Sequence, residues 1–210
     1  MLQKSIFALL NYINNMAYKK VTLSSGKDQS LRRFHPWVFS GAIKKMKEEI
    51  NDGEIVEVYD NKEELLGVGH YQDSSIAIRI FSFAKVVSDS GFWRSKIQSA
   101  YDFRKKIDIT DNENTNCYRL VFAEGDRMPG LIIDYYNGTC VLQCHSIGMH
   151  RMKNEIMEGL KDVFGEKLIA IFDKSAETLP KNYAQNVKNE YLFGKGTDEQ
   201  HIVKENGLNF

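Results

Sequence analysis

Short segments in which apolar and polar residues alternate run through the first 88 residues, and a period of two is typical of β-strands. The segments read "KKVTLS", "GEIVEVYD", "ELLGVGHYQ" and "SSIAIRIFSF", and polar turns such as "SSGKDQS" separate them. Several short strands with one apolar face each must bury those faces together, as a small barrel does. We therefore predict a compact barrel-like β domain over residues 16–88. Within it, Pro36 favours the first turn of a short helix through "PWVFSGAI".

A helical pattern begins near Ser90, because apolar residues recur there at a spacing of three and four. The helix is expected to turn one set of side chains toward a core, namely Trp93, Ile97, Ala100, Tyr101 and Phe103. Its opposite face is basic and is expected to point outward, with Arg94, Lys96, Arg104, Lys105 and Lys106.

Strand-like segments and one further helix follow. Strands are predicted at "YRLVFAE", "GLIIDYY", "TCVLQCHS" and "KLIAIFD", and a helix over residues 147–164 is expected to end at Gly165. Asn137 and Gly138 between two of the strands indicate a tight hairpin. The chain is therefore predicted to be α+β, with a strand-strand-strand-helix-strand domain over residues 89–190, a hairpin over residues 191–210, and an extension over residues 1–15. The apolar run in that extension is too short to span a bilayer.

The formal net charge of the chain is zero, with 28 basic and 28 acidic residues, so no whole-molecule field attracts nucleic acid or an anionic membrane. The charges are nevertheless segregated along the sequence. Residues 17–47 hold eight Lys or Arg and a single acid, Asp28, whereas residues 48–64 hold eight acids and a single base, Lys62. The two blocks either pair with each other as solvated faces or leave a local basic surface.

The three cysteines, Cys117, Cys140 and Cys144, are an odd number without paired spacing, which favours a reducing cytoplasm. Strand alternation places Cys140 and Cys144 on one face and His145 on the other, so we predict no metal site. Glu124 and Asp126 could form a general acid/base pair, but acidic surface turns are far commoner, and no complete catalytic constellation is present. The glycines of "GVGH" are interpreted as sites of close backbone packing rather than nucleotide binding.

Three segments occur in an order that resembles a known family. They read "KVTLSSGKDQSLRRFHPWVFSGAI", "GVGHYQDSSIAIRIFSF" and "CYRLVFAEGDRMPGLIIDYYNG". Together they resemble bacterial class I S-adenosylmethionine-dependent methyltransferases of large-subunit rRNA, specifically the cytosine-5 enzymes that open with a PUA domain. The resemblance implies a PUA-like small β-barrel that binds RNA, followed by the central α+β domain.

The same resemblance implies that catalysis lies outside this chain. In the family a strand pair such as "IVKENGLNF" leads into a catalytic domain that holds S-adenosylmethionine and the nucleophilic cysteine. We therefore expect this chain to be the RNA-recognising half of a cytoplasmic enzyme, with no catalytic, cofactor or metal residue of its own. The expected partner is ribosomal RNA, without a membrane, and a homodimer stays open. A stand-alone RNA-binding or assembly module is the alternative.

The stretch "LRRFHPWVFSGAI" is expected to carry the RNA contacts, since guanidinium groups and aromatic rings both stack on unpaired bases. Lys27, Arg32 and Arg33 are predicted to hold phosphates, with help from Arg79. Phe34 and His35 are predicted to be exposed partners of RNA. Trp37 and Phe39 are expected in the core, because large aromatic side chains usually bury most of their area.

Overall fold

The computed structural model describes residues 18–46, 48–110, 112–196 and 202–210. They fall into two compact units that divide between Ser88 and Asp89. The predicted N-terminal extension over residues 1–15 lies outside the described residues. Each unit is considered below by itself.

The N-terminal unit is a six-stranded, strongly curved sheet in the order β2-β6-β5-β4-β1-β3. Its strands are β1 (Lys19–Leu23), β2 (Trp37–Phe39), β3 (Ile43–Met46), β4 (Ile55–Tyr59), β5 (Leu65–Tyr71) and β6 (Ile76–Ser82). Strand β1 pairs in parallel with β4 and antiparallel with β3. The alternating apolar residues meet inside, where Val21, Val56, Val58 and Ile78 are fully buried. The predicted barrel-like β domain is confirmed.

The glycines of β5 serve close packing, as predicted. A Cβ atom on Gly69 would lie 2.5 Å from the carbonyl oxygen of Arg79, and one on Gly67 would lie 2.7 Å from that of Ser82. Both carbonyls belong to β6, the neighbouring strand. No larger residue fits at either position without moving backbone.

The helix predicted after Pro36 is wrong. Residues 37–39 form β2, which pairs antiparallel with β6 and places Val38 opposite Ile78. A short 3₁₀ turn, η1 (Ser40–Ala42), and β3 follow. The short helix α2 (Gln29–Arg32) instead begins at the end of the segment that was predicted to be a turn. Burying Val38 against the edge of β6 outweighs the local preference of proline for a helix start.

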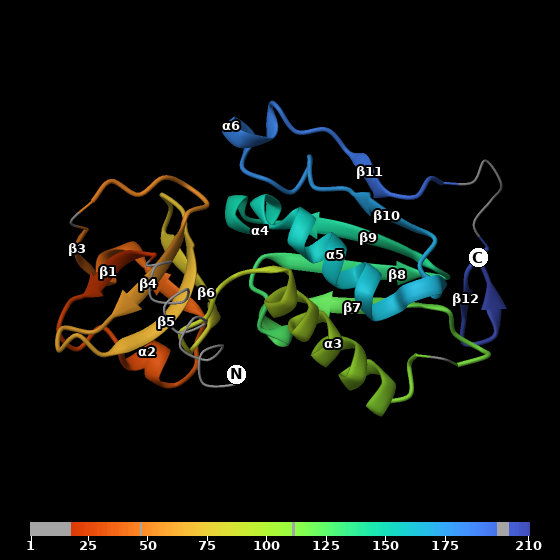
Figure 1. Ribbon diagram of the computed structural model, residues 1–210, viewed down its shortest axis with the longest axis horizontal. Helices are drawn as coiled ribbons and strands as arrows, with labels where there is room; N and C mark the ends of the chain where they lie inside the picture. Colours follow the sequence, from red (N-terminus) through yellow and green to blue (C-terminus); the bar gives the residue numbers. More distant parts are fainter. Residues whose placement is uncertain (1–17, 47, 111, 197–201) are drawn as a thin grey trace, which may run out of the picture. The chain divides into compact units, whose positions relative to one another are not determined.

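The C-terminal unit is a five-stranded sheet in the order β11-β10-β9-β8-β7, with helices packed over one face (Figure 1). Its strands are β7 (Cys117–Phe122), β8 (Leu131–Tyr136), β9 (Thr139–Cys144), β10 (Ala170–Asp173) and β11 (Glu190–Phe193). The helices are α3 (Ser90–Lys106), α4 (Ile147–Arg151), α5 (Lys153–Phe164) and the short α6 (Lys181–Ala184). A small hairpin of β12 (Lys204–Glu205) and β13 (Leu208–Asn209) closes the chain. This is the α+β architecture predicted from the sequence.

Local signals in this unit act as expected. The β8–β9 hairpin turns at Asn137 and Gly138, whose φ angles are +42° and +95°. The predicted helix over residues 147–164 is divided into α4 and α5 at Met152, and α5 ends at Gly165 with φ +54°. Helices α3 and α5 pack closely because Gly159 has no side chain, since a Cβ atom there would lie 3.0 Å from the backbone nitrogen of Arg94.

The predicted faces of α3 are wrong at two adjacent positions. Phe103, expected in the core, is 54% exposed, whereas Arg104, expected in solvent, is 6% exposed. The Arg104 guanidinium makes a bidentate ion pair with Asp126, one bond of which spans 2.7 Å, and its Nε donates to the Arg119 carbonyl at 3.0 Å. A cation can be buried here because a carboxylate from a distant turn meets it.

Arg104→Met is expected to lower the free energy of unfolding by about 3–5 kcal/mol, because Asp126 would keep a buried and unpaired charge. Urea denaturation of the variant and the parent measures the difference. The neighbouring Lys105→Met, at an exposed position, is the matched control and should stay within about 0.5 kcal/mol. Adding Asp126→Asn to Arg104→Met should recover part of the loss. Equal stability of Arg104→Met and the parent would contradict a structural ion pair.

Candidate functional site

A hollow of about 430 Å³ opens on the N-terminal unit between the segment around α2 and strand β2. Its wall is formed by Leu23, Gly26, Lys27, Gln29, Ser30, Leu31, Trp37, Val38, Phe39, Gly41 and Ala42. The exposed side chain of Lys27 lies at this hollow. The hollow therefore combines a cation with aromatic walls.

Aromatic rings continue from the hollow along β2. The His35 ring meets the Trp37 ring edge-on at 5.4 Å between centroids, and the Trp37 ring meets that of Phe39 at 6.4 Å. His35 Nδ1 also accepts a hydrogen bond from the Trp37 backbone N–H at 3.3 Å. The three rings occupy alternate residues, so they form a row on the outward side of the strand.

The expectation that Trp37 and Phe39 lie in the core is wrong for Phe39, which is 52% exposed, and holds only in part for Trp37, which is half-buried. Val38 between them is the buried residue of β2. The alternation in "WVF" carried this information, but interpreting the segment as a helix hid it. Trp37 and Phe39 are thus the residues of the hollow that the sequence reasoning missed.

Phe34 stands apart from this row and is strongly exposed, at 68%. Its ring contacts only the edge of Phe83, at 5.2 Å between centroids, among the ring contacts of the described residues. Its backbone has φ +62°, a left-handed conformation that residues other than glycine adopt at a cost. An exposed ring on a strained backbone is consistent with a binding role, which stays a prediction.

Arg32 is held by three carboxylates. Its Nε donates to Asp28 at 2.5 Å, and its Nη2 donates to Asp60 at 2.6 Å and to Glu64 at 2.9 Å. The hydrogen bond that the guanidinium donates to Asp28 is the largest of the effects that raise its pKa. Backbone N–H groups of Glu64 and Lys62, together with Arg32, hold the pKa of the Asp60 carboxyl below its usual range. Arg32 therefore ties α2 to the β4–β5 turn through Nε and Nη2, and its contact with phosphate stays a prediction.

The remaining predicted cations are placed differently. Lys27 and Arg33 are exposed, and neither makes an ion pair or a side-chain hydrogen bond within the part of the chain that the structure describes. Arg79 is half-buried on β6, opposite Trp37 in register, and its Nη1 donates to the Ile76 carbonyl at 3.2 Å. The basic and acidic blocks thus pair in part, through Arg32, Lys19 and Lys20, and leave Lys27 and Arg33 free for a ligand.

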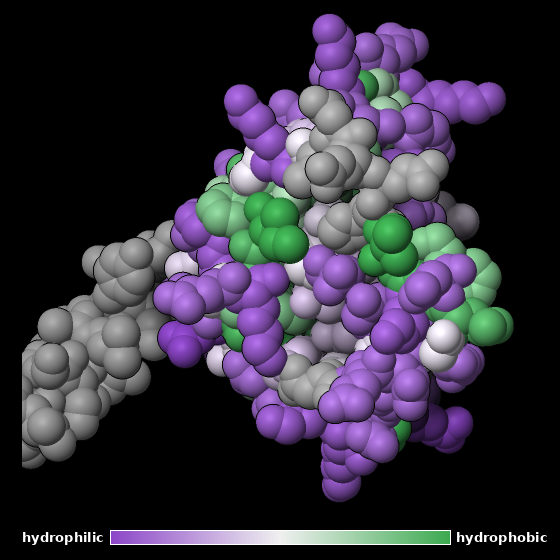
Figure 2. All heavy atoms as spheres, turned by 90° about the vertical axis from the view of Figure 1, so that its right-hand side faces the viewer, coloured by the Kyte–Doolittle hydropathy of each residue, from purple (hydrophilic) through white to green (hydrophobic). Residues whose placement is uncertain are grey.

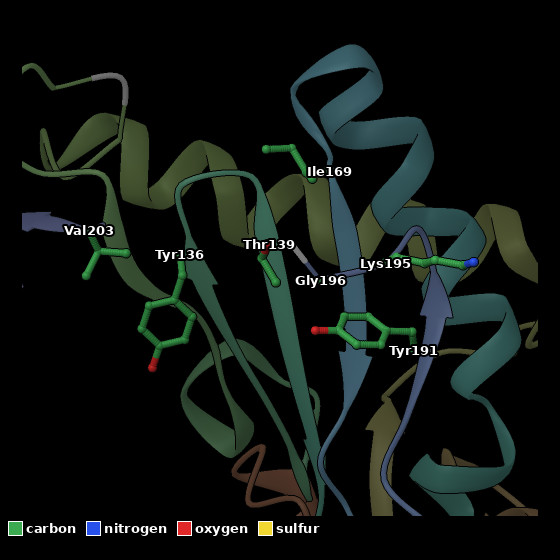
Figure 3. A pocket seen from close by; sticks show the side chains of 7 residues that line it. All are labelled: Tyr136, Thr139, Ile169, Tyr191, Lys195, Gly196 and Val203. Carbon is green, nitrogen blue, oxygen red and sulfur yellow. The ribbon is translucent and has the colours of Figure 1, made fainter. Parts of the chain in front are cut away.

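The C-terminal unit has a hollow of its own, of about 380 Å³, at the hairpin end of the sheet (Figure 3). It is lined by Tyr136, Thr139, Ile169, Tyr191, Lys195, Gly196 and Val203. Figure 3 shows Tyr136 and Tyr191 on opposite sides of Thr139, with the Lys195 ammonium pointing away from them. Figure 2 shows apolar side chains in separate patches among hydrophilic ones on this side of the unit. The hollow is mainly apolar and lacks an acid/base pair.

Cys140 and Cys144 both lie on the buried face of β9, whereas His145 is exposed, as alternation predicted. Burial raises the pKa of the Cys144 thiol to about 12 and raises that of Cys140 as well. Both thiols are therefore protonated and inert near neutral pH. Within residues 18–46, 48–110, 112–196 and 202–210, no three His, Cys, Asp or Glu side chains are grouped as a metal site would require.

Asp126 is occupied by structural bonds. Besides Arg104, it accepts the Phe122 backbone N–H at 2.5 Å. A general acid or base must reach a reacting atom and exchange a proton with it, which a carboxylate locked in this way does not do. The geometry thus supports a structural turn over an acid/base pair with Glu124.

Comparison with known proteins adds to this geometry. Residues 21–83 match the model of a PUA-like domain family. Over 90% of its length the chain is 35% identical to a ribosomal RNA large subunit methyltransferase I of Pseudoalteromonas atlantica, and 32% identical to one of Alteromonas mediterranea. The chain therefore contains a PUA-like domain and is similar over most of its length to these relatives. It spans about half of their length, 47% in each case.

Solved structures agree on the fold. The chain superimposes with a TM-score of 0.74 and 20% identity on a structure described as a SAM-dependent methyltransferase from Streptococcus mutans. A methyltransferase complexed with SAH gives a TM-score of 0.75 at 20% identity, and in both cases 91% of this chain covers 47% of the other. Among the residues placed in the PUA-like and C-terminal units, no helix has the length and apolar character needed to cross a membrane.

Arg32→Ala is expected to lower the melting temperature at neutral pH, because α2 would lose its link to the β4–β5 turn. The pKa values of Asp28 and Asp60 are lowered from 3.8 in the folded state, so the stability they contribute is present above about pH 4 and is lost as the pH falls through their folded values. The gap between the parent and Arg32→Ala should therefore narrow between pH 6 and pH 3. Melts across this range measure it, with Arg33→Ala as the control that should match the parent. A gap that stays constant with pH would contradict the role of these carboxylates.

Proposed function

We propose that the PUA-like domain binds ribosomal RNA at the hollow beside β2. Lys27 and Arg33 hold phosphates, Phe34 and His35 stack on unpaired bases, and the hollow accepts part of the strand against Trp37 and Phe39. The observation that carries this proposal is that Lys27 and Arg33 are exposed and make no ion pair or side-chain hydrogen bond among the described residues, close in sequence to the ring row of His35, Trp37 and Phe39. Phosphate contacts supply affinity and stacking is tolerant of sequence, which together suit single-stranded RNA.

Arg32 and Arg79 take indirect roles in this scheme. Arg32 fixes the end of α2, so that the two residues after it emerge at the surface in a defined direction. Arg79 lies across from Trp37 and supports the ring row from the neighbouring strand. Both were predicted to contact RNA directly, and we now assign them to positioning.

The relatives' names support a role in modification of the large ribosomal subunit. We propose that this chain delivers rRNA to a methyltransferase active site, with S-adenosylmethionine as methyl donor and C5 of a cytosine in 23S rRNA as target, in the cytoplasm. A base inside a helix cannot reach such a site, so a domain that holds the flanking strand assists in taking it out of the stack. We assign no residue of this chain to the cofactor or to the methyl transfer.

The double change Lys27→Ala and Arg33→Ala should weaken binding to a single-stranded fragment of 23S rRNA and flatten its dependence on salt. Each lost phosphate contact lowers the log-log salt slope by about 0.7. Fluorescence anisotropy at several salt concentrations measures affinity and slope, and circular dichroism checks the fold. The control is Lys174→Ala with Lys181→Ala, which removes the same charge at exposed positions of the C-terminal unit. If both double variants bind equally, the proposed surface is wrong.

Phe34→Gly separates binding from stability. Glycine adopts φ +62° without the cost that phenylalanine bears, so the variant should be at least as stable as the parent despite losing the contact with Phe83. Loss of one stacked base should still weaken RNA binding by about 1–3 kcal/mol. Thermal melts and anisotropy titrations give the two quantities. Unchanged affinity would remove Phe34 from the interface.

A further inference from the structure

A hollow of about 370 Å³ in the C-terminal unit lies between α3 and the 3₁₀ turn η2 (Ala123–Asp126). It is lined by Lys96, Ser99, Ala100, Phe103, Gly125, Asp126 and Arg127. None of these residues belongs to the surface proposed above for the PUA-like domain. The hollow is formed by the same pair of elements that the buried Arg104–Asp126 ion pair joins.

The turn beside this hollow is strained and locked. Ala123 and Arg127, on either side of its centre, have φ angles of +41° and +57°. Such a left-handed backbone conformation costs about 1–3 kcal/mol per residue and persists only where the surrounding structure enforces it. Asp126 supplies that constraint, since its carboxylate binds both Arg104 on α3 and the Phe122 backbone N–H. The turn therefore holds Arg127 in a fixed position against α3.

Lys96 brings a second positive charge to the same place. Its Nζ donates to the Arg127 backbone carbonyl at 3.0 Å, and an ammonium has two further N–H groups to donate. Burial, together with the nearby charge of Arg127, lowers the pKa of Lys96 to about 8. The carboxylate in the wall, Asp126, is already neutralised by Arg104. Two cations thus converge without a free counter-charge in the wall.

An aromatic ring completes the wall. Phe103 is 54% exposed, although the sequence pattern of α3 placed it in the core. The Arg104 guanidinium lies over its ring at 5.5 Å from the centroid, which holds the ring in place while one face stays accessible. A nucleotide requires a cation to bind its phosphate and an accessible ring to stack on its base, and the hollow offers both.

We propose that this hollow binds one nucleotide of an RNA strand, with the phosphate on Lys96 and Arg127 and the base against Phe103. The choice of RNA as the strand rests on the proposed function, whereas the affinity for phosphate rests on the geometry alone. An anion would relieve the repulsion between the two cations and satisfy the remaining N–H groups of Lys96. The site would give the C-terminal unit a contact with RNA independent of the PUA-like domain.

The decisive variant is Lys96→Gln with Arg127→Asn, since glutamine keeps an amide donor in place of the ammonium and asparagine tolerates the left-handed backbone. Anisotropy titrations with the single-stranded rRNA fragment at several salt concentrations should show weaker binding and a log-log slope lower by about 1.4, for two lost phosphate contacts. Lys174→Gln with Lys181→Gln is the matched control and should retain the parent slope. A slope equal to that of the parent in the Lys96/Arg127 variant would overturn the proposal.

Two further measurements keep the proposal testable if the double variant folds poorly. Phe103→Ala changes an exposed side chain and should weaken RNA binding without changing the melting temperature. In the unmodified chain, Lys96 should react readily with an amine-acylating reagent at pH 8, and RNA should protect it, as peptide mass spectrometry would show. Protection by inorganic phosphate alone, with none from RNA, would overturn the assignment to a nucleic-acid strand.

The outcome also separates this proposal from the proposed function. If the parent chain binds no RNA, the proposed function fails, and protection of Lys96 by inorganic phosphate decides whether the anion site exists. If the parent binds RNA and only the Lys27/Arg33 variant is weakened, the proposed function stands and the second site is wrong. If both double variants are weakened, both surfaces contact the strand.

Discussion

In each unit an arginine is held in ion pairs with carboxylates, and the candidate surface of that unit depends on this interaction. In the PUA-like domain Arg32 is held by Asp28, Asp60 and Glu64, and in the C-terminal unit Arg104 is held by Asp126. In each case the ion pair fixes a short, locally strained segment, and the next residues along the chain are cationic or aromatic and exposed. The two ion pairs thereby anchor the segments that carry Arg33, Phe34 and Arg127.

Strain and exposure coincide at these positions. Phe34 and Arg127 both have left-handed backbones, and folding would be favoured by glycine or asparagine at either place. Arg127 lines the hollow beside α3, and the Phe34 ring is exposed beside Phe83. The two surfaces share this composition of cation, ring and locked turn, which is the reason for treating both as contacts for one strand.

The similarity to rRNA methyltransferases covers only part of those proteins. The chain spans about half the length of its curated relatives, and its described residues hold buried, protonated thiols and a locked carboxylate in place of reactive groups. If the chain binds rRNA as proposed, contacts on both units would hold the strand more firmly than one contact alone.

Local patterns in the sequence determined the barrel-like and α+β architecture, the hairpin at Asn137 and Gly138, the end of α5 at Gly165, and the two buried cysteines of β9. They succeeded because alternation, helical spacing and turn chemistry act between residues close in the chain. Tertiary structure decided what depends on distant partners. Residues 37–39 became a strand because β6 pairs with them, and Phe103 and Arg104 exchanged their expected positions because Asp126 reaches Arg104. Asp60 and Glu64 bind Arg32 from 28 and 32 residues away. No local pattern in the sequence predicts such partners, because burying a charge becomes favourable only once the fold has brought its counter-charge into contact.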